Sequence, residues 1–222
     1  MSADFDVIVI GSGFGGSVSA LRLAEKGYRV AVLEQGRDLT SADLQRAGSS
    51  VRHLLWAPAL GMRGPLAQKV FANVGVVHGV GVGGGSLVYA AVLLEPKASF
   101  YQAPAWRDLH SDWQRELAPH YQRARQMLGA SVNPYVGLQD DWLQQTAAQL
   151  GRADSYGPVT QGIYFGVPEV AVDPFFAGKG PLRQGCSRCG NCISGCAQGA
   201  KNSLDKNYLH LARQLGVQVI SE

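Results

Sequence analysis

The chain opens with Asp6-Val-Ile-Val-Ile-Gly-Ser-Gly-Phe-Gly-Gly16, and Val30-Ala-Val-Leu-Glu34 follows after a segment in which apolar residues recur at helical spacing. Residues 7–10 form an apolar run of the length expected for a buried parallel strand. The glycines after this run have the G-x-G-x-x-G spacing of a dinucleotide-binding turn between a strand and a helix. The stretch therefore predicts an α/β chain that begins with a Rossmann-like βαβ unit.

Each glycine of this turn has a physical reason to be there. Gly11 permits the tight turn, Gly13 lets the backbone approach a pyrophosphate, and Gly16 lets the helix pack close to the strand. The helix N-terminus adds unpaired N–H groups that suit an anion. Glu34 ends the second strand, where its carboxylate can accept hydrogen bonds from ribose hydroxyls and disfavours a 2′-phosphate, so NADP is not expected. A glycine-rich turn that binds no nucleotide is the alternative.

Composition and charge exclude several classes of protein. The 222 residues are 46% hydrophobic and 17% charged, which is typical of a globular protein. The apolar runs are shorter than a bilayer span and the acidic N-terminus lacks the basic start of a signal peptide, so we expect no transmembrane segment and a cytoplasmic protein. The net charge of +3 comes from scattered basic residues, so no nucleic-acid partner is expected.

A second glycine cluster, His78-Gly-Val-Gly-Val-Gly-Gly-Gly-Ser86, has apolar segments on both sides at residues 74–77 and 87–94. A flexible linker would have polar flanks, so we expect this loop to be buried against a flat surface. A structural turn packed by glycine, without any cofactor contact, is the alternative.

Together, three segments resemble the glucose–methanol–choline (GMC) family of FAD-dependent oxidoreductases, in its cholesterol-oxidase-like branch. These segments are the first glycine motif with Glu34, the run from Gly81 to Tyr89, and the run from Gly195 to Leu209. The resemblance extends from Asp6 to the end of the chain and implies an incomplete Rossmann-like FAD-binding fold with helical and loop insertions. It matches only the N-terminal portion of such enzymes.

The resemblance implies FAD as the cofactor, with its pyrophosphate on the first glycine motif, its adenosine ribose on Glu34, and its isoalloxazine near the second glycine loop. Backbone N–H groups of that loop could stabilise the anionic reduced ring. One departure is visible at this loop, because sterol oxidases have Asn-Gly where this chain has Tyr89-Ala90. The expected cofactor-binding residues are Gly11, Gly13, Phe14, Gly15, Gly16, Glu34, Gln35, Gly79, Gly84, Gly85, Ser86, Tyr89 and Ala90.

We expect three regions. Residues 1–100 would form the N-terminal part of the FAD-binding domain, residues 101–180 a helical and loop region of the substrate domain, and residues 181–222 a cysteine-rich loop with a helix and a strand that return to the FAD-binding domain. A capping box at Ser111-Asp-Trp-Gln114 predicts a helix with a break at Pro119. A further helix from Asp140 would pack its apolar residues, including Trp142, in the core.

All four cysteines fall between residues 186 and 196. Cys186, Cys192 and Cys196 have the C-x₅-C-x₃-C spacing that binds a three-iron cluster in some bacterial FAD sugar dehydrogenases of this family, whereas Cys189 is a less probable ligand. We therefore predict a possible iron–sulfur cluster. Reduced structural thiols are a close alternative, and zinc or disulfides rank lower.

The expected function is oxidation of a CH–OH group in an alcohol, sterol or sugar-like small molecule, with hydride transfer to flavin. No catalytic residue is assigned in this chain, because the family's catalytic histidine, with its partner histidine or asparagine, lies in a C-terminal half that is absent here. One alternative is a non-catalytic fragment or a subunit that needs a second polypeptide carrying that half. Another is an NAD-dependent reductase. The sequence leaves open the substrate, the choice between oxidase and dehydrogenase, and the oligomeric state.

Overall fold

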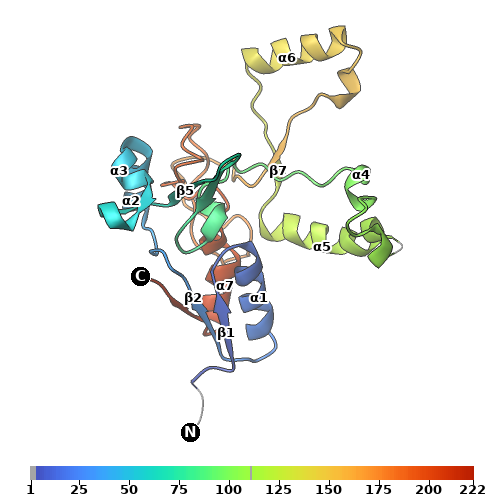
Figure 1. Ribbon diagram of the computed structural model, residues 1–222. Helices are drawn as coiled ribbons and strands as arrows, with labels where there is room; N and C mark the ends of the chain where they lie inside the picture. Colours follow the sequence, from blue (N-terminus) through green and yellow to red (C-terminus); the bar gives the residue numbers. More distant parts are fainter. Residues whose placement is uncertain (1–3, 111) are drawn as a thin grey trace.

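A three-stranded parallel sheet forms the base of the molecule in the computed structural model, which describes residues 4–110 and 112–222 (Figure 1). Its strand order is β1 (Val7–Ile10), β2 (Val30–Leu33) and β9 (Gln218–Ile220). All pairs are parallel, with Val7 opposite Val30 and Val32 opposite Val219. The first and last parts of the chain are therefore hydrogen-bonded in one sheet, and the predicted α/β fold with a βαβ unit is confirmed.

Two helices, α1 (Phe14–Ala24) and α7 (Tyr208–Gln214), lie side by side against one face of this sheet (Figure 1). Leu21 and Leu209 are fully buried between the helices and the strands, together with Val32. Burying each such side chain contributes about 1.5–3 kcal/mol to folding. This layer holds the N-terminus of α1 in a fixed place at the carboxyl ends of the strands.

The described residues leave the opposite face of the sheet uncovered. Side chains alternate between faces along a strand, so Val7 and Val9 point to the core while Ile8 and Ile10 point away from it. Ile10 is 88% exposed and Ile8 is 59% exposed. Leu33 and Ile220 on the two neighbouring strands are also exposed. An apolar sheet face of this kind is normally covered by another layer of structure.

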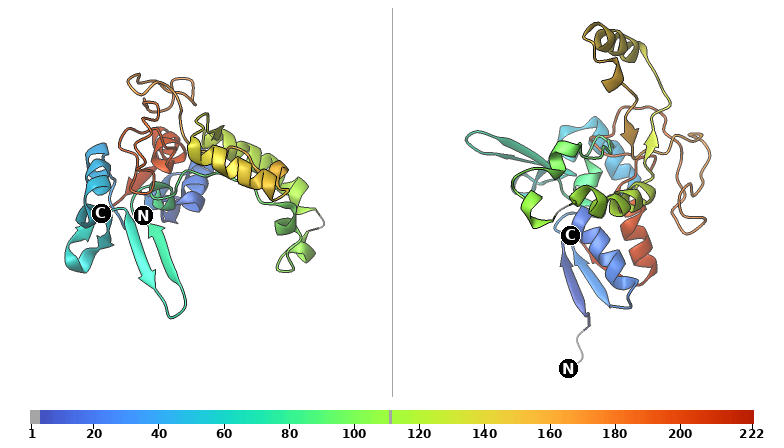
Figure 2. Two further views of the ribbon diagram at one scale, coloured as in Figure 1. Left: turned by 90° about the horizontal axis from the view of Figure 1, so that it is seen from above. Right: turned by 90° about the vertical axis from the view of Figure 1, so that its right-hand side faces the viewer.

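The remaining segments surround the carboxyl ends of the sheet. The hairpin of β5 (Leu66–Val70) and β6 (Gly75–Gly79) projects from the body, and the helices α5 (Trp113–Met127) and α6 (Leu138–Gln149) extend to the other side (Figure 2). None of the helices in the described part of the chain has both the length and the apolar character needed to cross a bilayer. The other helices are α2 (Ser41–Ser49), α3 (Val51–Leu54), α4 (Ala98–Tyr101), α5 (Trp113–Met127) and α6 (Leu138–Gln149). The other strands are β3 (Trp56–Ala57), β4 (Met62–Arg63), β5 (Leu66–Val70), β6 (Gly75–Gly79), β7 (Ser131–Val132) and β8 (Thr160–Gln161).

Two details of the middle region differ from the sequence prediction. Helix α5 runs through Pro119 without a break; this residue is exposed, so the polar groups that a proline leaves unpaired in a helix can reach water. Asp112 caps this helix by accepting from Arg115 N, whereas Ser111 lies outside the described residues. In α6 no residue is buried and Trp142 is 58% exposed, so the predicted core packing of this helix was wrong: its contact with the short turn at Ala153–Ser155 leaves its apolar side chains exposed.

Gly16 and Gly15 give a matched test of the close contact between α1 and β1. A Cβ atom at Gly16 would overlap the carbonyl oxygen of Gly11, whereas one at Gly15 would meet no atom within 4 Å. We expect Gly16→Ala to lower the free energy of unfolding by about 1–3 kcal/mol, because α1 must move away from the turn. Gly15→Ala should instead raise it by up to about 1 kcal/mol, through helix propensity. Urea unfolding of both variants measures this, and changes of the same sign would contradict the contact.

Candidate functional site

The first glycine loop connects β1 to α1. Gly11 has a φ of +91° and donates its N–H to the carbonyl of Leu33 at 2.7 Å, which holds the turn against the end of β2. Gly13 occupies the N-cap position of α1, where the described residues provide no side-chain cap, and the first turn has no acidic residue. The first N–H groups of the helix therefore point out of the turn without a capping group. Such a terminus favours an anion.

Ser12 links this loop to two other parts of the site, and the sequence analysis did not single it out. Its hydroxyl is fully buried and donates to Glu34 Oε2 at 2.6 Å, while it accepts from Gly83 N at 3.0 Å. The Ser12 N–H donates to the same carboxylate oxygen. One small side chain thus joins the first glycine loop, the end of β2 and the second glycine loop.

Glu34, the expected ribose ligand, lies beside the first glycine loop. Its Oε2 accepts from Ser12 and its Oε1 accepts from Gly36 N at 3.0 Å. A carboxylate has about four lone-pair sites, so one remains for a further donor. Gln35 follows it at an exposed position.

The second glycine loop packs directly on the first. Gly84 has a φ of +52°, and a Cβ atom there would lie 2.8 Å from the Gly13 Cα atom. A Cβ atom at Gly79 would overlap the carbonyl oxygen of Gly84. The predicted burial of this loop is therefore confirmed, and the surface against which these two glycines are crowded is protein backbone. Gly85 is different, because its nearest neighbour would be the Phe14 ring at 3.9 Å.

Ser86 and Tyr89 continue the second loop through a short 3₁₀ turn. The Ser86 hydroxyl donates to Gly83 O at 2.7 Å and accepts from Leu204 N at 2.9 Å, so its side chain is committed to partners within the protein. The Tyr89 hydroxyl donates to the carbonyl of Asn202, and its ring lies edge-on to Phe14 at 6.2 Å between centroids. Burial raises the pKa of the Tyr89 hydroxyl well above its ordinary value, so it stays a neutral donor.

Ala90 is exposed, while its neighbour Ala91 is fully buried with a φ of +65°, a conformation that non-glycine residues rarely adopt. The Ala91 carbonyl accepts a hydrogen bond from Gly162 N at 2.7 Å, and this bond to a residue outside the loop fixes the backbone geometry of Ala91. The chain therefore stores local strain directly after the predicted flavin contacts, a pattern often found at functional sites.

The cysteine segment (residues 186–196) carries the predicted ligands of the iron–sulfur cluster. All four cysteines are free, and the described residues contain no group of three side chains placed to hold a metal ion. The sulfur of Cys186 accepts from Arg188 N and that of Cys196 from Lys201 N. Burial raises the pKa of the Cys192 thiol above its ordinary value. The predicted iron–sulfur cluster on Cys186, Cys192 and Cys196 is therefore not supported by the described residues.

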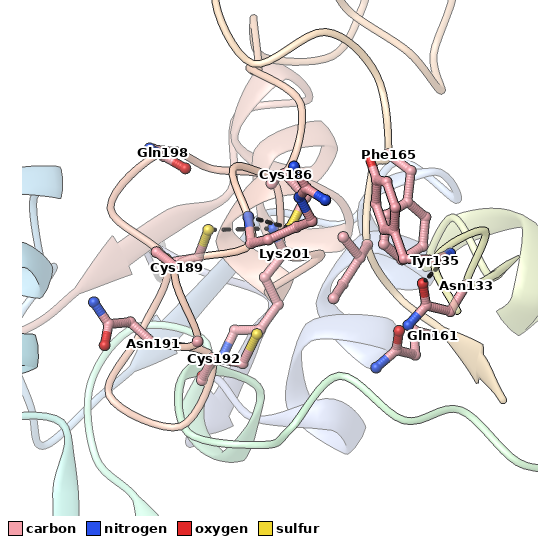
Figure 3. Close-up of a pocket in the computed structure, with 15 residues that line it drawn as sticks. Asn133, Tyr135, Gln161, Phe165, Cys186, Cys189, Asn191, Cys192, Gln198 and Lys201 are labelled. Atoms are coloured by element: carbon pink, nitrogen blue, oxygen red, sulfur yellow. Dashed lines mark hydrogen bonds between the residues drawn. The ribbon is translucent and has the colours of Figure 1, made fainter. Parts of the chain in front are cut away.

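A cavity of about 240 Å³ lies between the cysteine segment, residues 186–196, and the segment of residues 161–165 (Figure 3). Ile163 and Phe165 form part of its apolar wall with the cysteines, and Tyr135 stands at its edge beneath the guanidinium of Arg188. The same apolar cluster includes Ala91 and Tyr89, so the cavity is adjacent to the end of the second glycine loop.

Comparison with known proteins finds flavin-dependent relatives of this chain. Residues 6–72 match the family model described as FAD binding domain. A cholesterol oxidase of Mycobacterium tuberculosis is 46% identical over 99% of this chain and 39% of its own length, and one of Acinetobacter baumannii is 40% identical over 99% and 40%. A long-chain-alcohol oxidase of Arabidopsis thaliana is 26% identical over 97% and 26%.

Over nearly its whole length the chain is similar to the N-terminal part of cholesterol-oxidase-like members of the GMC family of FAD-dependent oxidoreductases. It spans about two fifths of the length of the two cholesterol oxidases.

The residues at the first glycine loop fit FAD. Cβ atoms placed at Gly11, Gly13 or Gly15 would meet no protein atom within 4 Å, so the space in front of the loop is open to a ligand. The uncapped helix terminus supplies donors for the pyrophosphate, and the remaining acceptor site of Glu34 lies next to it. The open space and the donors therefore occur in the same place.

Replacing Ser12 by alanine tests the connection between the three segments. Ser12→Ala removes the acceptor of the buried Gly83 N–H and one donor to Glu34, so we expect the free energy of unfolding to fall by about 1–3 kcal/mol. Ser19 is an exposed serine in the same region of the chain and serves as the control, because Ser19→Ala should change stability by less than about 0.5 kcal/mol. Equal effects of the two substitutions in chemical denaturation would refute the bridging role of Ser12.

Proposed function

We propose that this chain provides the FAD-binding part of an enzyme that oxidises a CH–OH group of a small-molecule alcohol. The observation that carries the proposal is the contact between the two glycine loops, since Gly84 lies against Gly13 and Ser12 is bonded to Gly83. This contact brings the second loop, with Tyr89 and Ala90, beside the open N-terminus of α1. A nucleotide bound at the first loop would then extend along the second.

Within this proposal the residues divide by the part of FAD that each would hold. The N–H groups from Gly13 to Gly16, including those of Phe14 and Gly15, would bind the pyrophosphate, and Glu34 with Gln35 would bind the adenosine ribose. Gly79, Gly84, Gly85, Ser86, Tyr89 and Ala90 would line the isoalloxazine through their backbone, because the Ser86 and Tyr89 hydroxyls already have partners. FAD would supply the hydride acceptor, and the chain would supply binding and orientation.

The substrate class we propose is a predominantly apolar alcohol. The relatives are named for cholesterol and for long-chain alcohols, which share a hydroxyl on an apolar body. The apolar cavity beside Ala91 is consistent with such a molecule.

We further propose that catalysis needs structure beyond these residues. The exposed face formed by Ile8, Ile10, Leu33 and Ile220, and the absence of burial in α6, both favour a missing layer of protein. A C-terminal portion, in the same polypeptide or in a second one, would cover these surfaces and bring the group that removes the proton from the substrate hydroxyl.

Gly13→Ala separates cofactor binding from folding. The added methyl group would meet no protein atom, but it would occupy the space in front of the helix terminus. We therefore expect FAD affinity to fall by about tenfold or more, equivalent to about 1.4 kcal/mol of binding free energy, with little change in unfolding. Flavin absorbance after reconstitution and denaturant unfolding measure the two effects. Gly75→Ala, in the β5–β6 hairpin and equally free of contacts, is the control.

The unmodified protein should bind about one FAD per chain and no NAD. A chain that remains colourless after reconstitution should gain flavin when the complementary C-terminal polypeptide is added, if it is a subunit. Failure to bind FAD under both conditions would overturn the proposed function.

A further inference from the structure

Two cations are buried close together behind the second glycine loop. Arg183 and Lys201 are each only 2% exposed. In the described part of the chain neither of them forms an ion pair with a carboxylate, and the nearby Asp205 pairs with Lys206 instead. Buried charges without a counter-ion are expensive and are retained only when other groups satisfy them.

Carbonyl groups satisfy Lys201. Its ammonium donates to Leu87 O at 2.7 Å, to Tyr89 O at 3.2 Å and to Cys192 O at 2.6 Å. All three N–H bonds of the ammonium group are therefore used. Leu87 and Tyr89 belong to the end of the second glycine loop. Cys192 belongs to the cysteine segment and lies beside Lys201 (Figure 3). Lys201 is thus a single point that fixes both segments relative to each other.

Arg183 fixes the backbone that carries Lys201. Its Nε donates to Gly199 O at 2.6 Å, its Nη2 donates to Ala200 O at 2.8 Å, and its Nη1 donates to the side chain of Asn202. The planar guanidinium fixes several groups at once, which a flexible ammonium cannot do. Arg183 therefore holds the residues on both sides of Lys201 in place.

The ammonium group of Lys201 also lies close to Tyr89, one of the predicted flavin contacts. Its Nζ lies 5.1 Å from the centre of the Tyr89 ring, and this ring in turn contacts Phe14 of the first glycine motif. Burial lowers the pKa of Lys201 to about 8, while the nearby Cys192, Cys196 and Asp205 act in the opposite direction. The side chain is mainly charged at neutral pH, since this pKa lies above 7.

We propose that Lys201 is a positioning residue for the second glycine loop: its ammonium holds the backbone of Leu87 and Tyr89 to the cysteine segment and places a buried positive charge behind the loop that favours the reduced, anionic flavin. The second half of this statement rests on the proposed function, and the first half does not. A positive charge in a poorly solvated region stabilises a nearby anion more than it would in water.

The positioning role can be tested without flavin. Lys201→Met keeps the length of the side chain and removes the donors, whereas Lys201→Arg keeps the charge; Lys179→Met, at an exposed lysine, is the control. We expect Cys192 to react with a thiol reagent about tenfold faster in Lys201→Met than in the parent chain, with Lys201→Arg and Lys179→Met close to the parent. Peptide mass spectrometry identifies the labelled cysteine. Equal labelling rates in a folded Lys201→Met variant would overturn the positioning role.

Hydrogen exchange in the unaltered chain covers the case in which Lys201→Met does not fold. If Lys201 joins the two segments, peptides covering residues 84–90 and 189–196 should exchange with one common opening rate. Faster, independent opening of the cysteine segment would overturn the positioning role.

The charge is tested in the complete FAD-bound protein by the midpoint potential of the flavin. Lys201→Met should shift the potential to a more negative value, and Lys201→Arg should restore it, because the reduced anion loses and then regains its neighbouring cation. A potential that is unchanged in Lys201→Met, while FAD remains bound, would overturn the electrostatic role. Loss of FAD binding in the parent protein would instead count against the proposed function, leaving the thiol and exchange results to decide the positioning role.

Discussion

The hydrogen bonds of the Ser12 hydroxyl are the interaction on which the rest of the site depends. A hydroxyl can donate one hydrogen bond and accept others, and here the donor goes to Glu34 while the acceptor takes the Gly83 N–H. Three segments that are far apart in the sequence meet at this one oxygen atom. Because the atom is fully buried, water cannot replace any partner that is lost. The relative position of the two glycine loops is thus set by this small polar group and by the backbone contact between Gly13 and Gly84.

The loops behind this contact are held by cations bonded to carbonyl groups. In the described residues neither a disulfide nor a metal group joins the cysteine segment to its surroundings. Lys201 and Arg183 bind carbonyl oxygens from several segments, and Asp173 binds four backbone N–H groups of the adjacent loop that ends at Gly180. Irregular backbone needs partners for its polar groups when it is removed from water. Charged side chains provide several such partners from one position, which explains how this loop-rich region stays ordered.

Several apolar surfaces are exposed in the described part of the chain. Ile8 and Ile10 on the sheet, Phe71 and Val74 in the projecting hairpin, and Trp142 and Leu143 of α6 are all exposed. The chain corresponds to about two fifths of the length of the cholesterol oxidases to which it is related. Helical spacing at Trp142 and Leu143 correctly indicated a helix. It could not reveal whether the partner of that helix lies in the same part of the protein, because periodicity encodes a face and not what covers it.

The sequence by itself determined the N-terminal βαβ unit, the positions of its turn and the class of ligand, because strand length, glycine spacing and helix periodicity are local properties of consecutive residues. It also located the second glycine loop and its burial. Only the tertiary structure decided that Ser12 joins these loops and that Lys201 bonds to carbonyls from two distant segments. Those outcomes depend on which backbone groups come into contact after folding. The presence of a serine or a lysine in the sequence does not determine which distant backbone groups its side chain will contact.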